Sequence, residues 1–117
     1  MTATPPKAKR RKAVSLLPRS TKALLEAGWV LVETTERWVP HSPVRKDLFG
    51  FGDLLAIRPN EVLVVQVTNT KHQADRIDKI ANHSNVAAVR EAGIGIHVHG
   101  WKKNAKGRWV LTVTDIS

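Results

Sequence analysis

The chain has 117 residues, with four tryptophans and no cysteine. This length predicts a single domain, since domains most often have about 100–150 residues. The lack of cysteine excludes disulfides and thiolate-bound zinc. Its apolar runs are far shorter than the roughly 18 residues of a transmembrane helix, and no signal-peptide pattern is visible. We therefore expect a soluble intracellular protein without a membrane partner.

The net charge of +9 is concentrated near the N-terminus. Residues 1–22 hold seven basic residues and no acid, whereas the rest of the chain carries 12 basic and 10 acidic residues. A segment this polar, with charges of one sign, does not collapse into a packed structure. We therefore predict a disordered basic tail over residues 1–19 and one domain over residues 20–117. Such a tail attracts polyanions by releasing their counterions. It favours nucleic acid as a partner, although a solubilising arm or a nuclear targeting signal has the same composition.

The first predicted element of the domain is a short helix over residues 21–27. Ser20 is a suitable N-cap residue, and Gly28 can end the helix in the left-handed conformation. Leu24 and Leu25 are expected to face inward.

Three strands are expected next. Residues 29–37 are rich in strand formers. Residues 48–57, interrupted by Gly50 and Gly52, should pair with residues 61–68 as a β-hairpin. The second strand of this hairpin is apolar on both faces, which is typical of a central strand.

The second half of the chain contains a further helix. It is capped by Asn69 or Thr70 and runs to about Ala81, with Ala74, Ile77 and Ala81 on one face. The remaining predicted elements are a short helix and two strands: residues 86–92, 94–101 and 108–114. The order α-β-β-β-α-β-β predicts an α/β fold with a mixed sheet.

One segment combines an acid at a kinked strand with a polar pair on the next strand. Asp53 follows Gly52, and Gln66 and Thr68 lie two residues apart on the partner strand. Alternation puts this pair on one face, and the hairpin can bring that face beside Asp53. Oxygen ligands that converge at a bend of a sheet suit Mg²⁺. A metal held there can activate water and stabilise the charge that develops on a phosphodiester.

This arrangement resembles the PD-(D/E)XK nuclease superfamily, and in particular its small Holliday-junction-resolvase-like and phage-type nucleases. The resemblance covers about residues 20–115. That family has a restriction-endonuclease-like α-β-β-β-α-β core, with an Asp on the second strand and an acid-x-Lys motif on the third. The resemblance implies that Asp53 binds metal and that Gly52 replaces the motif's proline. Gln66 then takes the place of the second acid and Thr68 that of the lysine.

Gln66 and Thr68 depart from the family pattern. Glutamine offers only a neutral oxygen, which lowers the affinity for Mg²⁺, and threonine lacks the positive charge of the lysine. Either other residues compensate or the site has lost its chemistry and the domain only binds. If others compensate, the second carboxylate comes from Glu33 or Glu26. The replacement cation then comes from the second helix: Lys71, Arg76 or Lys79.

The function that the resemblance implies is a metal-dependent DNA endonuclease acting on branched or duplex DNA, with Mg²⁺ or Mn²⁺ as cofactor. The expected catalytic residues are Asp53, Gln66, Lys79, Arg76, Glu33 and Glu26. The expected metal ligands are Asp53, Gln66 and the carbonyl of Val67. We also expect a homodimer, because symmetric cutting of two strands needs two active sites, and a location in the cytoplasm of a bacterium or a phage-infected cell.

The predicted turn over residues 102–107 carries basic residues between two tryptophans, which suits contacts with the DNA backbone and its bases. An ordinary solvated turn between core tryptophans has the same pattern. The expected nucleic-acid-binding residues are Lys9, Arg10, Arg11, Lys12, Lys46, Lys71, Lys102, Lys103 and Arg108.

Two other classes of function remain open. A catalytically inactive nucleic-acid-binding protein on the same fold would bind DNA in a salt-sensitive way, without metal and without need of Asp53. A protein-interaction module would keep its partner after loss of residues 1–19 and would show little affinity for DNA.

His97 and His99 lie on one face of a predicted strand and could bind a transition metal. Without cysteine or a clear third ligand, a structural or exposed pair is the favoured interpretation.

Overall fold

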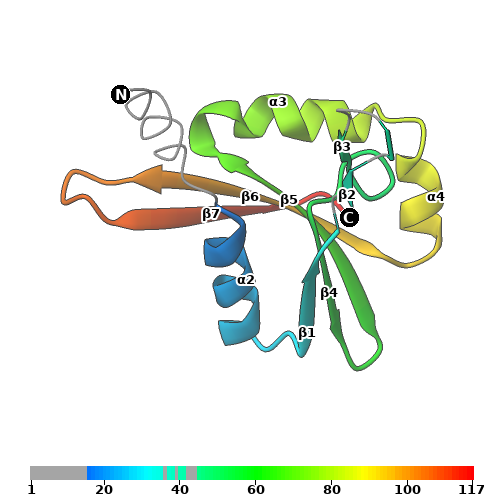
Figure 1. The fold of residues 1–117 in the computed structure, drawn as a ribbon, viewed down its shortest axis with the longest axis horizontal. Coiled ribbons are helices and arrows are strands. Elements are labelled where there is room, and N and C mark those ends of the chain that lie inside the picture. The colour runs from blue at the N-terminus through cyan, green and yellow to red at the C-terminus, as the bar shows by residue number, and fades with distance from the viewer. Residues whose placement is uncertain (1–15, 36, 39, 42–44) are drawn as a thin grey trace.

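The protein is described here from a computed structural model, which covers residues 16–35, 37, 38, 40, 41 and 45–117. The tail residues expected to bind nucleic acid lie outside this part of the chain: Lys9, Arg10, Arg11 and Lys12. Figure 1 shows a β-sheet with helices on both of its faces. The α/β class is therefore confirmed.

The central sheet has five strands in the order β1-β4-β5-β6-β7. Neighbouring strands are antiparallel except for β5 and β6, which are parallel. The sheet is therefore mixed, as the sequence predicts. The strands are β1 (Leu31–Thr34), β4 (Leu54–Arg58), β5 (Glu61–Asn69), β6 (Gly95–Lys103) and β7 (Trp109–Asp115).

Helices cover the sheet on both sides. Helix α2 (Leu17–Glu26) packs on one face, and α3 (Thr70–Ala81) packs on the other with the shorter α4 (Val86–Glu91). Helices α3 and α4 form the crossover that the parallel pair β5 and β6 requires. A small separate hairpin joins β2 (Arg37–Trp38) to β3 (Arg45–Lys46).

The core has two halves because β5 is apolar on both faces. Val64 packs toward α3 and α4, in a cluster that includes Ile80 and Ile96. Leu63 and Val65 point to the opposite face and belong to the cluster that contains Leu24 of α2. The prediction of β5 as a central strand is confirmed.

Helix α2 differs from its prediction in three ways. It begins at Leu17, before the expected domain boundary at residue 20, with Pro18 in its first turn, a position that proline favours. Ser20 is fully buried inside the helix, so it is not the N-cap. Leu25 is 47% exposed, so only Leu24 of the leucine pair faces the core.

Helix α3 has the predicted bounds, and the side chain of Asn69 caps it by accepting a hydrogen bond from the His72 amide. Its buried face is rotated from the predicted one. Gln73 and Ile80 are buried and Ile77 is half-buried, whereas the alanines at positions 74 and 81 are exposed. A buried glutamine breaks the apolar periodicity from which the face was predicted.

The strand bounds also differ from the prediction. β1 is shorter than residues 29–37, and β4 begins at Leu54 rather than at residue 48. The residues before Leu54 form a tight turn instead of a strand. β6 and β7 extend past the predicted ends, to Lys103 and Asp115, and form a hairpin that projects beyond the rest of the domain (Figure 1).

Candidate active site

The glycine-rich segment before β4 forms a tight turn that leads into Asp53. The backbone groups of Leu48 and Gly52 exchange two hydrogen bonds of 2.8 and 2.9 Å. Three residues lie between them, and the first two, Phe49 and Gly50, have positive φ angles of 57° and 92°, as the central residues of a type I′ turn do. Phe51 is buried in the core beneath α3. The turn therefore fixes the direction in which the chain enters β4.

Asp53 lies directly after this turn, where the sheet begins, and is only 9% exposed. Its backbone N–H donates to the Val65 carbonyl at 2.8 Å, and its backbone carbonyl accepts from Thr35. Its Oδ2 accepts two hydrogen bonds, from Nε2 of Gln66 at 2.5 Å and from the Val67 amide at 2.8 Å. The expected proximity of Asp53 and Gln66 is confirmed.

Gly52 is the residue that the resemblance sets against the motif's proline. A Cβ atom at this position would lie 2.5 Å from Cγ1 of Val64, which is fully buried. The Gly52 amide also donates to the Leu48 carbonyl, and proline has no such proton. This turn therefore needs glycine, and the departure from the family pattern has a local physical reason.

Gln66 and Thr68 are both buried, on the face of the sheet that α3 covers. Besides its bond to Asp53, Nε2 of Gln66 lies 3.5 Å from the Val67 carbonyl oxygen. The amide group thus lies between the carboxylate and the carbonyl expected to bind a metal. We refer to Asp53, Gln66 and Thr68 as the acidic cluster.

The two candidate second carboxylates lie in different places. Glu33 is exposed on β1 and pairs with Leu55, whose side chain packs on the α3 side of the sheet, the side of the acidic cluster. Glu26 is exposed at the end of α2, which covers the other face, and it lines a hollow there with Arg108. Glu33 is therefore the better placed of the two.

The candidate cations are all on the surface. Lys71, Arg76 and Lys79 are exposed on α3, which covers the same face of the sheet as the acidic cluster. Lys46 is exposed in β3, just before the turn that leads to Asp53. Among the residues that the structure describes, no group of three His, Asp or Glu side chains is close enough together to hold a metal ion.

Three further residues expected to bind nucleic acid gather at the β6–β7 hairpin. Lys102 and Lys103 end β6, and Arg108 precedes β7. All three are exposed. The indole of Trp109, half-buried at the same end, has the Lys103 ammonium 5.5 Å from its centroid.

A second buried polar group, on the α2 side of the sheet, is absent from the prediction. Ser20 Oγ lies 2.9 Å from Nδ1 of His99 and accepts a 2.8 Å hydrogen bond from Nε1 of Trp101. Burial lowers the pKa of His99 to about 4, and the charge of neighbouring His97 lowers it further in the same direction. We call Ser20, His99 and Trp101 the histidine cluster. The alternation of His97 and His99 in the sequence signals a shared face, but nothing in it indicates the serine 79 residues away.

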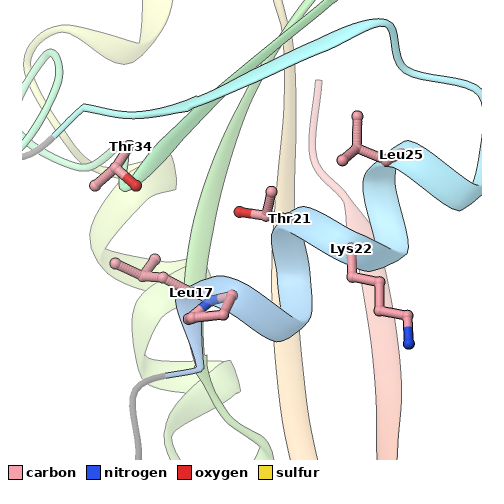
Figure 2. Close-up of a pocket in the computed structure, with 6 residues that line it drawn as sticks. Leu17, Thr21, Lys22, Leu25 and Thr34 are labelled. Carbon is pink, nitrogen blue, oxygen red and sulfur yellow. The ribbon is translucent and has the colours of Figure 1, made fainter.

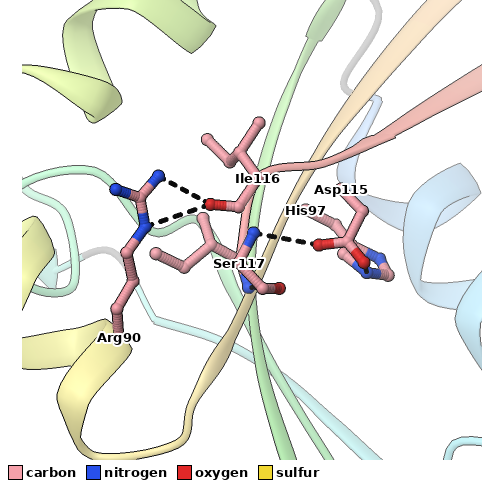
Figure 3. Close-up of polar contacts among 6 residues, drawn as sticks. Arg90, His97, Asp115, Ile116 and Ser117 are labelled. Atoms are coloured by element: carbon pink, nitrogen blue, oxygen red, sulfur yellow. Dashed lines mark hydrogen bonds and ion pairs between the residues drawn. The ribbon is translucent and has the colours of Figure 1, made fainter.

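His97 pairs with Val65 of β5, whose side chain points to the face opposite the acidic cluster, and belongs to a polar group that Figure 3 shows. Its Nε2 lies 3.6 Å from Oδ2 of Asp115, whose other oxygen accepts from the Ser117 amide. Hydrogen bonds from Ser117, with a smaller contribution from His97, lower the pKa of Asp115. Arg90 of α4 donates twice to the Ile116 carbonyl. These contacts fasten the end of β7 to α4 and β6.

A shallow hollow of about 500 Å³ lies between α2 and the end of β1, and Figure 2 shows residues that line it. Leu17, Thr21 and Leu25 of the helix face Thr34 of the strand across it. Among the described residues that line it, Lys22 is the one that carries a charge. This described lining contains no carboxylate and no imidazole.

Comparisons of the chain with protein-family models, with curated proteins and with solved structures found no match. Within the described residues, no helix combines the length and apolar character needed to cross a membrane.

Proposed function

We propose that this chain is a divalent-metal-dependent DNA endonuclease with a restriction-endonuclease-like fold, and that Asp53 is the central residue of its active site. The observation that carries the proposal is the hydrogen bonding of Asp53 at the meeting point of β4 and β5. Counting along the five-stranded sheet, these are the second and third strands. They are the strands on which the PD-(D/E)XK resemblance expects its acids.

The fold supports the same proposal. One helix precedes three successive strands of the main sheet, and a helical crossover leads to the parallel strand β6. This is the α-β-β-β-α-β order of the family, with the β2–β3 hairpin, α4 and β7 as additions.

The donors around Asp53 fit a hard cation in kind, although they are fewer than the family supplies. Mg²⁺ or Mn²⁺, when bound, lowers the pKa of water and offsets negative charge on a phosphodiester. Asp53 contributes the charge, and Val67 and Gln66 each contribute a neutral oxygen. For the Gln66 oxygen to point inward, its amide must turn, because Nε2 now donates to Asp53. Glu33, on the same side of the sheet, is the candidate for a second negative charge.

The lysine of the PD-(D/E)XK motif supplies a positive charge at the active site. In this chain we assign that role to a basic side chain of α3. Thr68 is buried and neutral, so it can donate a hydrogen bond but cannot hold a phosphate by charge. Lys71, Arg76 and Lys79 are long, exposed side chains over the same face. Their reach allows one of them to steady the scissile phosphate.

The test is cleavage of labelled duplex, single-stranded and four-way-junction DNA with Mg²⁺ or Mn²⁺. We expect the wild-type protein to cut at least one of these and to stop when EDTA is added. Asp53→Asn keeps the shape of the side chain and should lower the rate at least about a hundredfold, with DNA binding retained. The matched control is Asp75→Asn, which changes an exposed acid of α3. Equal cutting by wild type and Asp53→Asn, or none by wild type, contradicts the proposal.

A second function is favoured by one specific observation, the contact of the Gln66 nitrogen with Asp53. An amide N–H₂ group that bonds the carboxylate satisfies it without any metal. This supports the alternative of a catalytically inactive nucleic-acid-binding protein on the same fold. Such a protein binds DNA equally well in EDTA and as Asp53→Asn, loses affinity steeply with salt, and cuts nothing.

We also propose a homodimer, on the ground that a double-strand cut needs two active sites. Light scattering on the purified full chain distinguishes a dimer from a monomer.

A further inference from the structure

Two hollows meet at the indole of Trp109, at the base of the projecting β6–β7 hairpin. One, of about 520 Å³, lies against the start of α3, and the other, of about 400 Å³, lies against α2. Trp101 and Trp109 line both of them. Volumes of this order are within the range of about 300–1,000 Å³ that holds small organic ligands.

The two tryptophans that line both hollows differ in their hydrogen bonding and in their exposure. Trp101 is buried, and its N–H is fixed to Ser20. Trp109 is half-buried and keeps part of its ring accessible. The Arg19 guanidinium lies 4.8 Å from the ring centroid of Trp109 and the Lys103 ammonium 5.5 Å. Both cations lie over the ring of Trp109, one from α2 and one from β6, so a ligand that stacks on the indole takes the place of one of them.

The hollow on the α3 side is strongly positive. Among the described residues that line it, the charged ones are three lysines: Lys71, Lys102 and Lys103. The three lysines are exposed and can turn toward a phosphate. The hollow on the α2 side includes Glu26 as well as arginines, so it is the less attractive of the two for an anion.

The α3-side hollow is close to Asp53. Asn69, which lines it, pairs with Trp101 across β5 and β6. Val67, whose amide bonds Asp53, is two residues earlier on the same strand. Two strand residues span about 7 Å, which is roughly two base steps at about 3.4 Å each.

We propose that the α3-side hollow binds one unpaired base of a DNA substrate, stacked on Trp109 with its phosphates on the surrounding lysines. The inference rests on the proposed action on DNA and specifies its substrate as branched or locally unpaired rather than fully paired. In a perfect duplex both faces of each base are covered by its neighbours, so only an unpaired base can lie on an indole. Aromatic stacking accepts any base, and lysines hold the backbone without reading sequence.

The test is binding in EDTA, so that its outcome does not depend on cleavage. Fluorescence anisotropy compares a fully paired duplex with one of the same length that contains three adjacent T·T mismatches. Both carry the same number of phosphates. We expect wild type to bind the mismatched duplex at least about fivefold more tightly, and Trp109→Ala to lose this preference while its affinity for paired DNA stays within about twofold. Trp109→Phe should keep most of the preference.

The matched control is Trp29→Phe, because Trp29 also lies beside a cation, the Arg58 guanidinium at 4.1 Å, but contributes to neither hollow. It should keep the full preference. A measurement that needs no variant uses 2-aminopurine opposite guanine in the mismatched region, because thymine would pair with it; its fluorescence should fall when wild type binds. No preference in wild type, an unchanged preference in Trp109→Ala, or unquenched 2-aminopurine overturns the proposal. Loss of cleavage with the preference intact would count against the nuclease proposal alone.

Discussion

The sheet carries a buried polar cluster on each face, and the two differ in charge and in position. The histidine cluster is neutral, lies beneath the first half of α2, and links this helix to the distant strand β6. The acidic cluster contains a carboxylate, lies at the end of the sheet, and links the neighbouring strands β4 and β5. A closed neutral cluster fixes one element on another. The acidic cluster is the one of the two that contains a carboxylate, which is why the proposed chemistry is assigned to Asp53 and not to His99.

The largest expected effect comes from opening the histidine cluster. Ser20→Ala leaves the Trp101 N–H and Nδ1 of His99 buried without their shared partner. Each such group costs about 1–3 kcal/mol, so the free energy of unfolding should fall by about 2–6 kcal/mol. Urea denaturation at neutral pH measures this loss.

The control for this change is Ser84→Ala, the same substitution at an exposed position, which should have little effect. If Ser20→Ala is as stable as this control, the cluster does not hold α2 in place. Cleavage of DNA by folded Ser20→Ala should stay near the wild-type rate, since the two clusters lie on opposite faces.

The next effect is the pH dependence that His99 imposes. Its pKa is lowered from 6.5 to about 4 in the folded protein, so below pH 6.5 the unfolded chain takes up a proton that the folded one does not. The free energy of unfolding is therefore highest above pH 6.5. It falls as the pH is lowered toward 4, by about 3 kcal/mol in total. Urea denaturation at a series of pH values from 7 to about 4 follows this loss.

The variant that isolates this effect is His99→Gln, whose stability should change much less over the same range. The exposed carboxylates of Glu61 and Asp115 also have lowered pKa values. Their contribution to the stability of the folded protein is lost at lower pH, where they take up protons. An equal slope in wild type and His99→Gln between pH 6.5 and 4 would contradict the assignment.

Much of the fold follows from local sequence signals. The apolar run of β5, the Asn69 cap of α3 and the glycines around the turn before β4 are all short-range features, and each predicts its element. The bounds of α2 and the buried face of α3 were wrong because polar residues replace apolar ones at their contacts. Ser20 and Gln73 bond to groups of β6 and β7 far along the chain, and no local pattern contains that information.

The acidic cluster was predictable for the same reason that the histidine cluster was not. Asp53 and Gln66 are 13 residues apart in one hairpin, whose pairing register follows from alternation and a tight turn. Ser20 and His99 meet only when α2 packs on the finished sheet. The position of Trp109 between two hollows likewise depends on packing, although the sequence predicted the mixture of basic and aromatic residues there.

A smaller effect is expected from a methyl group at the turn that positions Asp53. Gly52→Ala places Cβ 2.5 Å from Cγ1 of buried Val64, and such overpacking costs about 1–3 kcal/mol. In a Val64→Ala background the same substitution should cost less, since the clashing atom is gone. Thermal or urea unfolding of the two single variants and the double variant measures this coupling. If the losses in the free energy of unfolding of the two single variants add up in the double variant, the turn shifts to accommodate the methyl group without contacting Val64.

The smallest expected effect adds the family's missing charge to the acidic cluster. Gln66→Glu places a second carboxylate beside Asp53, and repulsion between like charges should lower the free energy of unfolding by about 1 kcal/mol in EDTA. Millimolar Mg²⁺ should restore this loss, because a cation between two carboxylates relieves the repulsion. The control is Gln73→Glu, which changes a buried glutamine of α3 itself that bonds to β6 and β7 instead. If Mg²⁺ restores the stability of Gln66→Glu but not that of Gln73→Glu, a cation fits in the acidic cluster, whatever the activity of the natural sequence. Equal responses of the two variants to Mg²⁺ would leave Asp53 as a carboxylate that joins two strands, in the same structural role that the histidine cluster has on the other face.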